Sequence, residues 1–244
     1  DEQVDIKWTT LIRFEETLQD PAIWKLAAAS GCKTLYYGME SANERVLELM
    51  DKHAKKSVIQ NNLREAAKVG IWNHVMAFYG FPGETHEEAE DTRQFLLDNK
   101  VAIHSVELFY FVAYRHTPMV RNPEKFGITI HQQDEYDMPL DYYYTLNEPG
   151  GVSCLDAMQL CEEFYQKDFE PWAVRINARE QIFLYISKFG TNTLPEIYAT
   201  KHSPAEGEPD SVAGLITWPV AKADPEGGKE GEPGMARVVS HTAQ

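Results

Sequence analysis

The sequence is poor in cysteine, and the few cysteines it has form no metal-binding pattern. Only three are present in 244 residues, Cys32, Cys154 and Cys161, and no two of them form a C-x-x-C pair. An odd number of widely spaced cysteines does not favour the disulfide framework of a secreted domain, so we expect reduced thiols. Cys154 and Cys161 lie seven residues apart in a predicted helix and share a face, where buried small side chains are a better interpretation than metal ligands.

Long apolar runs and basic residues are also scarce. No stretch approaches the ~18 consecutive apolar residues of a membrane-spanning helix, and no signal-peptide pattern opens the chain. The 23 Lys and Arg residues stand against 38 Asp and Glu, which gives a net charge of −15. Nucleic acids and anionic membranes bind clustered Lys and Arg, so neither is expected as a partner. We expect a cytoplasmic protein that binds a small-molecule or peptide substrate.

The first half of the sequence repeats a pattern of strands and helices. Strand-like segments are predicted at 6–12, 34–37, 71–79 and 105–114. The expected helix starts between them are Asp20 with Pro21, the pair Ser41 and Glu44, Ser57, and the pair Thr85 and Glu88. Strands joined through helices indicate right-handed βαβ units. The predicted fold class is therefore α/β, with four parallel strands and helices outside them.

The second half has a different character. Residues 121–150 are polar and rich in Tyr and Asp, which predicts an irregular connection with short elements. Residues 153–189 predict two helices broken at Pro171, and residues 203–244 are rich in Gly, Pro and acidic side chains, which is typical of a disordered tail. The predicted division is 1–128 for the sheet, 129–202 for a connecting segment and helical cap, and 203–244 for the tail.

Three motifs lie in order along the predicted sheet. The first is Leu35-Tyr-Tyr-Gly-Met-Glu-Ser41, followed by the predicted helix at 43–52. The second is Gly70-Ile71, followed by Phe78-Tyr-Gly-Phe-Pro-Gly-Glu-Thr85. The third is Tyr114-Arg-His-Thr-Pro-Met119. Together they resemble the fourth, fifth and sixth strands of radical S-adenosylmethionine (SAM) enzymes, particularly those with a cobalamin-binding domain before the barrel. The third motif departs from the family, which often has Pro-Gly-Thr-Pro in that loop.

This resemblance implies a partial (β/α)6 barrel that holds a [4Fe-4S] cluster and SAM at its strand ends. In the family the cluster cleaves SAM to a 5′-deoxyadenosyl radical, and three thiolates bind the cluster. Those cysteines, usually C-x3-C-x2-C, follow the first strand, whereas this sequence has no such run and its first strand resembles the third. We therefore expect the C-terminal part of an enzyme whose parent uses cobalamin for radical methylation or rearrangement of an unactivated carbon. By itself the chain is expected to be inactive.

The resemblance also implies a SAM site at the carboxyl ends of the strands. Glu40 is expected at the ribose hydroxyls or the ammonium group of SAM, with a solvated or salt-bridged carboxylate as the alternative. Arg13 is expected at its carboxylate, although an ion pair with Glu40 or Glu15 is an equal alternative. Phe78, Tyr79 and Gly80 are expected at the adenine, with core packing as the alternative for the two rings.

Five further residues have weaker assignments. Ser41 and Tyr114 are included in the SAM site, although a helix cap explains Ser41 better than a ligand contact does. Arg115 and His116 are candidates for substrate contact, because they follow the last predicted strand. Glu84 is expected to complement a helix N-terminus.

Two other classes of function stay open. A non-catalytic half barrel could serve as a protein interaction module in which a partner chain, or a missing N-terminal half, supplies the absent strands. The exposed edge of the first strand favours this alternative. An ordinary SAM- or phosphate-binding α/β enzyme is disfavoured, because the sequence has neither a Gly-rich nucleotide loop nor a G-x-S-x-G motif.

Overall fold

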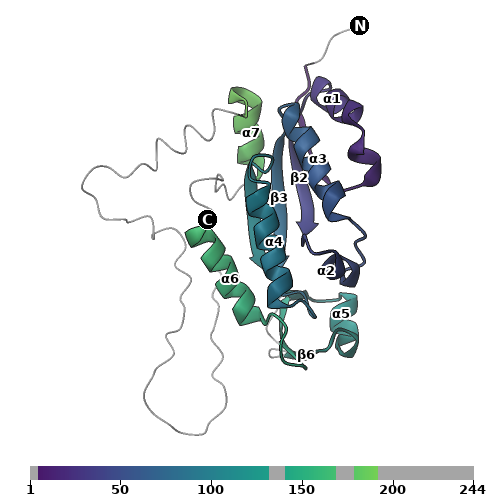
Figure 1. Ribbon diagram of the computed structural model, residues 1–244, viewed down its shortest axis with the longest axis vertical. Coiled ribbons are helices and arrows are strands. Elements are labelled where there is room, and N and C mark those ends of the chain that lie inside the picture. The colour runs from purple at the N-terminus through teal and green to yellow at the C-terminus, as the bar shows by residue number, and fades with distance from the viewer. Residues whose placement is uncertain (1–4, 132–140, 169–178, 192–244) are drawn as a thin grey trace, which may run out of the picture. The chain divides into compact units, whose positions relative to one another are not determined.

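A four-stranded parallel sheet forms the centre of the computed structural model, which describes residues 5–131, 141–168 and 179–191 (Figure 1). Its strands are β1 (Trp8–Ile12), β2 (Cys32–Glu40), β3 (Trp72–Tyr79) and β4 (Ser105–Tyr110). They pair in the order β1-β2-β3-β4, and each pair is parallel. Strands that neighbour one another in sequence therefore neighbour one another in space. The predicted α/β fold with four parallel strands is confirmed.

One side of the sheet is covered by helices. The connecting helices are η1 (Glu16–Gln19), α1 (Pro21–Ala29), α2 (Glu44–Leu49), α3 (Lys56–Lys68) and α4 (His86–Asp98). Alternate strand residues, such as Tyr37, Val75 and Leu108, pack in one core with Trp24 of α1 and Leu63 of α3. Side chains alternate between the two faces of a strand, so the residues between these face the other way. We call this opposite side the inner face.

Two of the predicted helix starts are confirmed. The side chain of Asp20 accepts a hydrogen bond from the Ala22 N–H at the start of α1. Thr85 and Glu88 form the reciprocal capping box of α4. Both arrangements are local, so the sequence pattern alone was sufficient to find them.

The other two starts were predicted wrongly. Asn43, not Ser41, caps α2, because its Oδ1 accepts hydrogen bonds from the N–H groups of Arg45 and Val46. Helix α3 begins at Lys56, before Ser57, and its N-cap has no side-chain hydrogen bond. The first error follows from the strand: β2 does not stop at Gly38 but runs to Glu40, so the helix begins later.

The last predicted strand is divided between two sheets. β4 ends at Tyr110, and β5 (Ala113–Tyr114) pairs antiparallel with β7 (Asp141–Leu146). β6 (Ile128–His131) pairs with the other edge of β7, which gives the order β5-β7-β6. The same region holds α5 (Pro118–Arg121) and η2 (Pro123–Phe126). The segment predicted as an irregular connection thus contributes most of a small antiparallel sheet.

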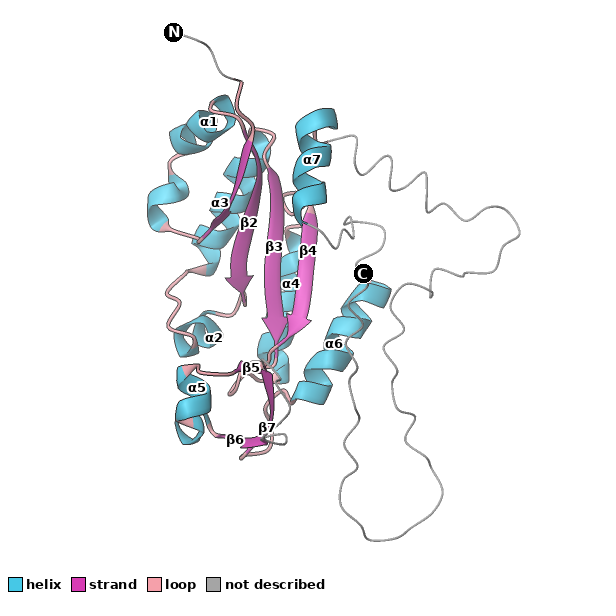
Figure 2. Ribbon diagram, turned by 180° about the vertical axis from the view of Figure 1, so that it is seen from behind, coloured by secondary structure: helices cyan, strands magenta, loops and turns pink. Residues whose placement is uncertain are grey.

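The helical region after the small sheet joins the main sheet. α6 (Cys154–Lys167) packs against β3 and β4 and contributes Ala157, Cys161 and Phe164 to the core of the helical side. α7 (Arg179–Phe189) packs against β2, and its Ile182 and Ile186 are buried outside that core. Because α1 and α3 occupy the helical side, we place α7 on the inner face (Figure 2). Pro171 and the predicted tail 203–244 lie outside the described residues.

Helix α7 covers the inner face at the amino ends of the strands. The Nζ atom of Lys7, just before β1, donates a hydrogen bond to the Ser187 carbonyl at 2.8 Å. This contact fixes the end of the sheet on which α7 lies. Among the described residues, no helix combines the length and the apolar character needed to cross a membrane.

Candidate functional site

Three rows of side chains run across the inner face. Going toward the carboxyl ends of the strands, they are Tyr36, His74 and Ser105, then Gly38, Met76 and Glu107, and finally Phe78 and Phe109. The first row is buried, since His74 is 2% exposed, whereas Phe109 in the last row is 50% exposed. Among the described residues, the inner face is therefore covered at the amino ends and only partly open at the carboxyl ends, where Met76 and Phe78 are half-buried. This open half is where parallel α/β sheets bind ligands.

Glu40 has an unusual backbone conformation at this opening. Its φ is +66°, in the left-handed region that a glutamate seldom adopts. A Cβ atom at Gly38 would lie 3.0 Å from Glu40 Oε1, so the carboxylate folds back over this glycine. Lys52 Nζ donates to the same oxygen at 2.5 Å, and both side chains are about a quarter exposed, at 28% for Lys52 and 25% for Glu40. A strained residue held by an ion pair at a strand end is typical of a functional position.

The turn after β3 is held by contacts from three parts of the chain. Gly80 has φ +87°, and a Cβ atom there would lie 2.8 Å from the Cβ of Ala157 in α6. The Gly80 N–H donates to Glu84 Oε2 at 2.5 Å. The hydroxyl of Tyr144, in β7, donates to the Gly80 carbonyl at 2.7 Å. Only glycine fits this position, and both of its backbone polar groups are bonded.

Glu84 is a buried carboxyl group inside this turn. Its burial raises the pKa to about 7, against the opposing effect of the Gly80 N–H. Within the described residues, its Oε1 atom has no hydrogen-bond partner. Glu84 serves the Gly80 turn, whereas Thr85 and Glu88 cap the N-terminus of α4. Its expected role at the helix N-terminus is thus replaced by a role in the turn.

The structure separates the three residues expected at the adenine. Phe78 faces the inner side, where its ring lies 5.3 Å from that of Phe111. Tyr79 is 1% exposed in the core of the helical side, and burial raises the pKa of its hydroxyl well above the usual value. Glu40 and Tyr79 end adjacent strands at the same edge of the sheet. The Tyr79 ring nevertheless lies on the face opposite to Phe78.

Ser41 and Arg13 have contrasting surroundings. Ser41 is buried, and its Oγ lies 3.0 Å from Thr92 Oγ1 and accepts from the Asn43 N–H. These contacts tie the end of β2 to α4. Arg13 follows β1, is exposed, and forms no ion pair with another described residue. The partner of Glu40 is Lys52, so the alternative of an Arg13–Glu40 pair is not what the structure shows.

The candidates of the third motif lie with the small sheet. Tyr114 is 56% exposed on β5. His116 is exposed and has φ +67° in the turn that follows, and Arg115 lies between the two. These residues belong to the small sheet and to the turn after β5 rather than to a strand of the main sheet.

Sequence reasoning missed two residues of the opening. Lys52 lies in the first motif but was given no role, because only the folded chain shows that it reaches Glu40. Glu107 is the single charged residue in β4, and a lone carboxylate within an apolar strand was the available signal.

The cysteines do not fit an iron–sulfur cluster. Cys32 begins β2 and Cys161 lies in α6, and burial raises the pKa of both thiols to about 12. Cluster ligands are thiolates, which such burial disfavours. Across the described ranges, no three His, Cys, Asp or Glu side chains gather in a metal-binding group.

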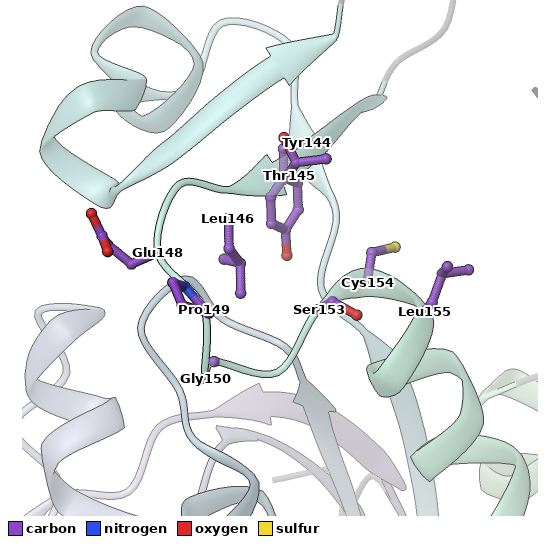
Figure 3. Close-up of a pocket in the computed structure, with 10 residues that line it drawn as sticks. Tyr144, Thr145, Leu146, Glu148, Pro149, Gly150, Ser153, Cys154 and Leu155 are labelled. Atoms are coloured by element: carbon purple, nitrogen blue, oxygen red, sulfur yellow. The ribbon is translucent and has the colours of Figure 1, made fainter. Parts of the chain in front are cut away.

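A surface pocket of about 440 Å³ lies between β7 and the start of α6. Tyr144, Leu146, Ser153 and Cys154 line it together with the loop that joins these elements (Figure 3). The pocket is next to the small sheet and is distinct from the open half of the inner face. Burial raises the pKa of the Cys154 thiol, which makes it a poor nucleophile.

Comparison with known proteins finds a family model that matches part of this chain. Residues 6–96 match the model of the radical SAM superfamily, a segment that contains β1 to β3, Glu40 and the Gly80–Glu84 turn. The resemblance inferred from the first two motifs is thereby confirmed. The third motif lies beyond the matched segment.

The chain is similar to particular methyltransferases over limited lengths. It is 35% identical over 94 residues to an uncharacterized methyltransferase of Pyrococcus horikoshii, a match that covers 38% of this chain and 20% of the relative. The chain thus spans about a fifth of that relative.

Two solved structures share the fold. The radical SAM methyltransferase TsrM from Kitasatospora setae, with cobalamin and a [4Fe-4S] cluster bound, has a TM-score of 0.53 at 12% identity and covers 79% of this chain and 44% of its own. The cobalamin-dependent SAM radical enzyme OxsB has a TM-score of 0.51 at 12% identity, and the match covers 82% of this chain and 35% of OxsB. At these identities the likeness establishes the fold.

Proposed function

We propose that this chain supplies the C-terminal, SAM-binding part of the barrel of a radical SAM methyltransferase. The observation that carries this proposal is the strained Glu40, which is held over Gly38 by Lys52 at the open carboxyl end of β2. The match of residues 6–96 to the radical SAM superfamily supports it. The names of the Pyrococcus horikoshii relative and of TsrM support methyl transfer as the reaction.

Different residues at the opening bind different groups of SAM. Glu40 accepts hydrogen bonds from the ribose hydroxyls or pairs with the ammonium group, and Lys52 fixes its carboxylate in place. Phe78 and the backbone of Gly80 contact the adenine from β3, and Arg13 pairs with the SAM carboxylate from the end of β1. Bound with its cluster, SAM supplies the methyl group or the radical of the reaction.

The remaining cofactors are proposed for the whole protein and not for these residues. The cysteine environments described above do not fit a cluster, so we assign the [4Fe-4S] ligands to another segment or chain. We propose a cobalamin-dependent parent because TsrM and OxsB are both named as cobalamin proteins. A cytoplasmic location and a small-molecule or peptide substrate, with neither nucleic acid nor membrane as partner, complete the proposal.

Calorimetric titration of the chain with SAM tests the proposal. Glu40→Gln keeps the size of the side chain and removes its charge, and we expect at least about tenfold weaker binding, since a hydrogen bond to a charged group contributes about 1.5–3 kcal/mol. Glu48→Gln, on the exposed side of α2, is the matched control and should bind as the wild type does. Equal affinities of wild type and Glu40→Gln, or no binding by the wild type, would eliminate the proposed site.

A second candidate is the non-catalytic interaction module. Leu11 in β1 is 65% exposed and pairs with Tyr36 in the first inner row, so an apolar side chain borders the inner face at the edge strand. An added strand would cover it and pair with β1. Protection of the β1 amides from hydrogen exchange by a partner chain, with no affinity for SAM, would favour this candidate.

A further inference from the structure

The small sheet reaches the turn after β3 through the side chain of Tyr144. Tyr144 lies in β7, is 6% exposed, and donates its hydroxyl proton to the Gly80 carbonyl at 2.7 Å. Gly80 is buried as well, so its carbonyl depends on a donor from the protein rather than on bulk water. Without this donor, the carbonyl would stay buried with a hydrogen bond lost or would turn toward solvent, and both outcomes cost free energy.

The ring of Tyr144 also connects to Phe78, through Phe111. The ring centroids of Phe111 and Tyr144 lie 6.1 Å apart, and those of Phe111 and Phe78 lie 5.3 Å apart. The Phe111 N–H donates to the Tyr79 carbonyl at 2.7 Å, which ties Phe111 to the end of β3. Tyr144 therefore supports both residues that we propose at the adenine, Gly80 through its hydroxyl and Phe78 through the aromatic contacts.

The loop after β7 holds the other end of the same turn. The Val152 N–H donates to the Glu84 carbonyl at 2.8 Å, and Thr85 forms an antiparallel bridge with Gly151. The hydroxyl of Tyr144 holds the beginning of the turn, where the chain leaves β3. The orientation of the peptide after Gly80 is thus set by a segment outside residues 6–96, the part that matches the radical SAM superfamily.

We propose that Tyr144 is a positioning residue for SAM, because its hydroxyl fixes the Gly80 carbonyl and thereby the surface of the turn against which the adenine packs. Tyr144 acts through Gly80 and needs no contact with SAM. When the hydroxyl is removed, the peptide after Gly80 is free to rotate, and the turn no longer presents a single surface to the adenine. This inference rests on the proposed function, because it takes the Gly80 turn to contact SAM.

Calorimetric titration with SAM compares the wild type with Tyr144→Phe, which keeps the ring and removes only the hydroxyl. We expect about five- to tenfold weaker binding, the range that corresponds to the loss of one buried hydrogen bond. Tyr165→Phe is the matched control, because the Tyr165 hydroxyl also bonds backbone groups, the N–H and the carbonyl of Leu108 in β4. This control loses comparable contacts outside the turn and should bind SAM as the wild type does.

Hydrogen exchange of the chain without SAM gives a second readout. Tyr144→Phe should accelerate exchange at the Gly80 and Glu84 amides severalfold more than at the amides of β2, whereas Tyr165→Phe should not single out the turn. Unchanged SAM affinity in Tyr144→Phe, an equal loss of affinity in both variants, or unchanged exchange at the turn would each overturn the inference and leave the proposed SAM site standing. No binding of SAM by the wild type would instead eliminate the proposed function, and this inference with it.

Discussion

Replacement of Glu84 by Gln should change the way in which stability depends on pH. The folded chain raises the pKa of this carboxyl to about 7, because the group is buried, while its ordinary value is 4.5. The folded state therefore binds the Glu84 proton more tightly than the unfolded state does. Stability from this group is fully present below about pH 4.5 and is lost as the pH rises to about 7.

The size of the effect follows from the difference between these pKa values. A difference of about 2.5 units corresponds to about 3 kcal/mol of unfolding free energy, at about 1.4 kcal/mol per unit. Glu84→Gln keeps an oxygen that can accept the Gly80 N–H and has no proton to lose. The unfolding free energy of the wild type minus that of Glu84→Gln should thus fall by up to about 3 kcal/mol between pH 4 and pH 8.

The comparison must be made as a difference between variants because His104 acts in the opposite direction. Burial lowers the pKa of His104 to about 4, so its contribution to stability rises with pH between about 4 and its ordinary value of 6.5. This contribution is the same in both proteins and cancels. Urea unfolding, followed by tryptophan fluorescence at several pH values, gives the two curves.

Glu87→Gln is the matched control, since Glu87 lies three residues later and is exposed. Its unfolding free energy should run parallel to that of the wild type across the whole pH range. Parallel curves for Glu84→Gln as well, within about 0.5 kcal/mol, would refute the conclusion that burial controls the ionisation of Glu84.

Two further substitutions test how the sheet is held. Gly80→Ala should lower the unfolding free energy by about 2–4 kcal/mol, because Gly80 has a positive φ and a Cβ atom there would lie 2.8 Å from Ala157. Gly70 also has a positive φ but faces open space, so Gly70→Ala should cost only about 1 kcal/mol. Equal losses of unfolding free energy in urea would contradict this. The Tyr165 hydroxyl accepts a hydrogen bond from the N–H of Leu108 and donates one to its carbonyl. Tyr165→Phe should therefore lower the unfolding free energy by about 1–2 kcal/mol and accelerate hydrogen exchange at the Leu108 N–H. An unchanged exchange rate would count against this prediction.

Much of the main sheet could be predicted because its signals are local. The capping box of Thr85 and Glu88 involves neighbouring residues, and the strands of the βαβ units have the composition of buried strands. The second sheet was missed because its strands lack such local signals. β5 has two residues and β6 has four, and such short strands become visible only through their pairing with β7.

By itself, the sequence determined the order of the four parallel strands and their helices, and it placed Glu40 and Gly80 near the carboxyl ends of their strands. Only the tertiary structure decided which face each side chain occupies: Phe78 and Tyr79 were both expected at the adenine, but Tyr79 lies in the core of the helical side and Phe78 packs with Phe111 on the inner face. Contacts between distant segments decided the rest: Lys52 with Glu40, Tyr144 with Gly80 and His74 with Glu107. Such pairs depend on packing of the whole chain, and no local pattern specifies them.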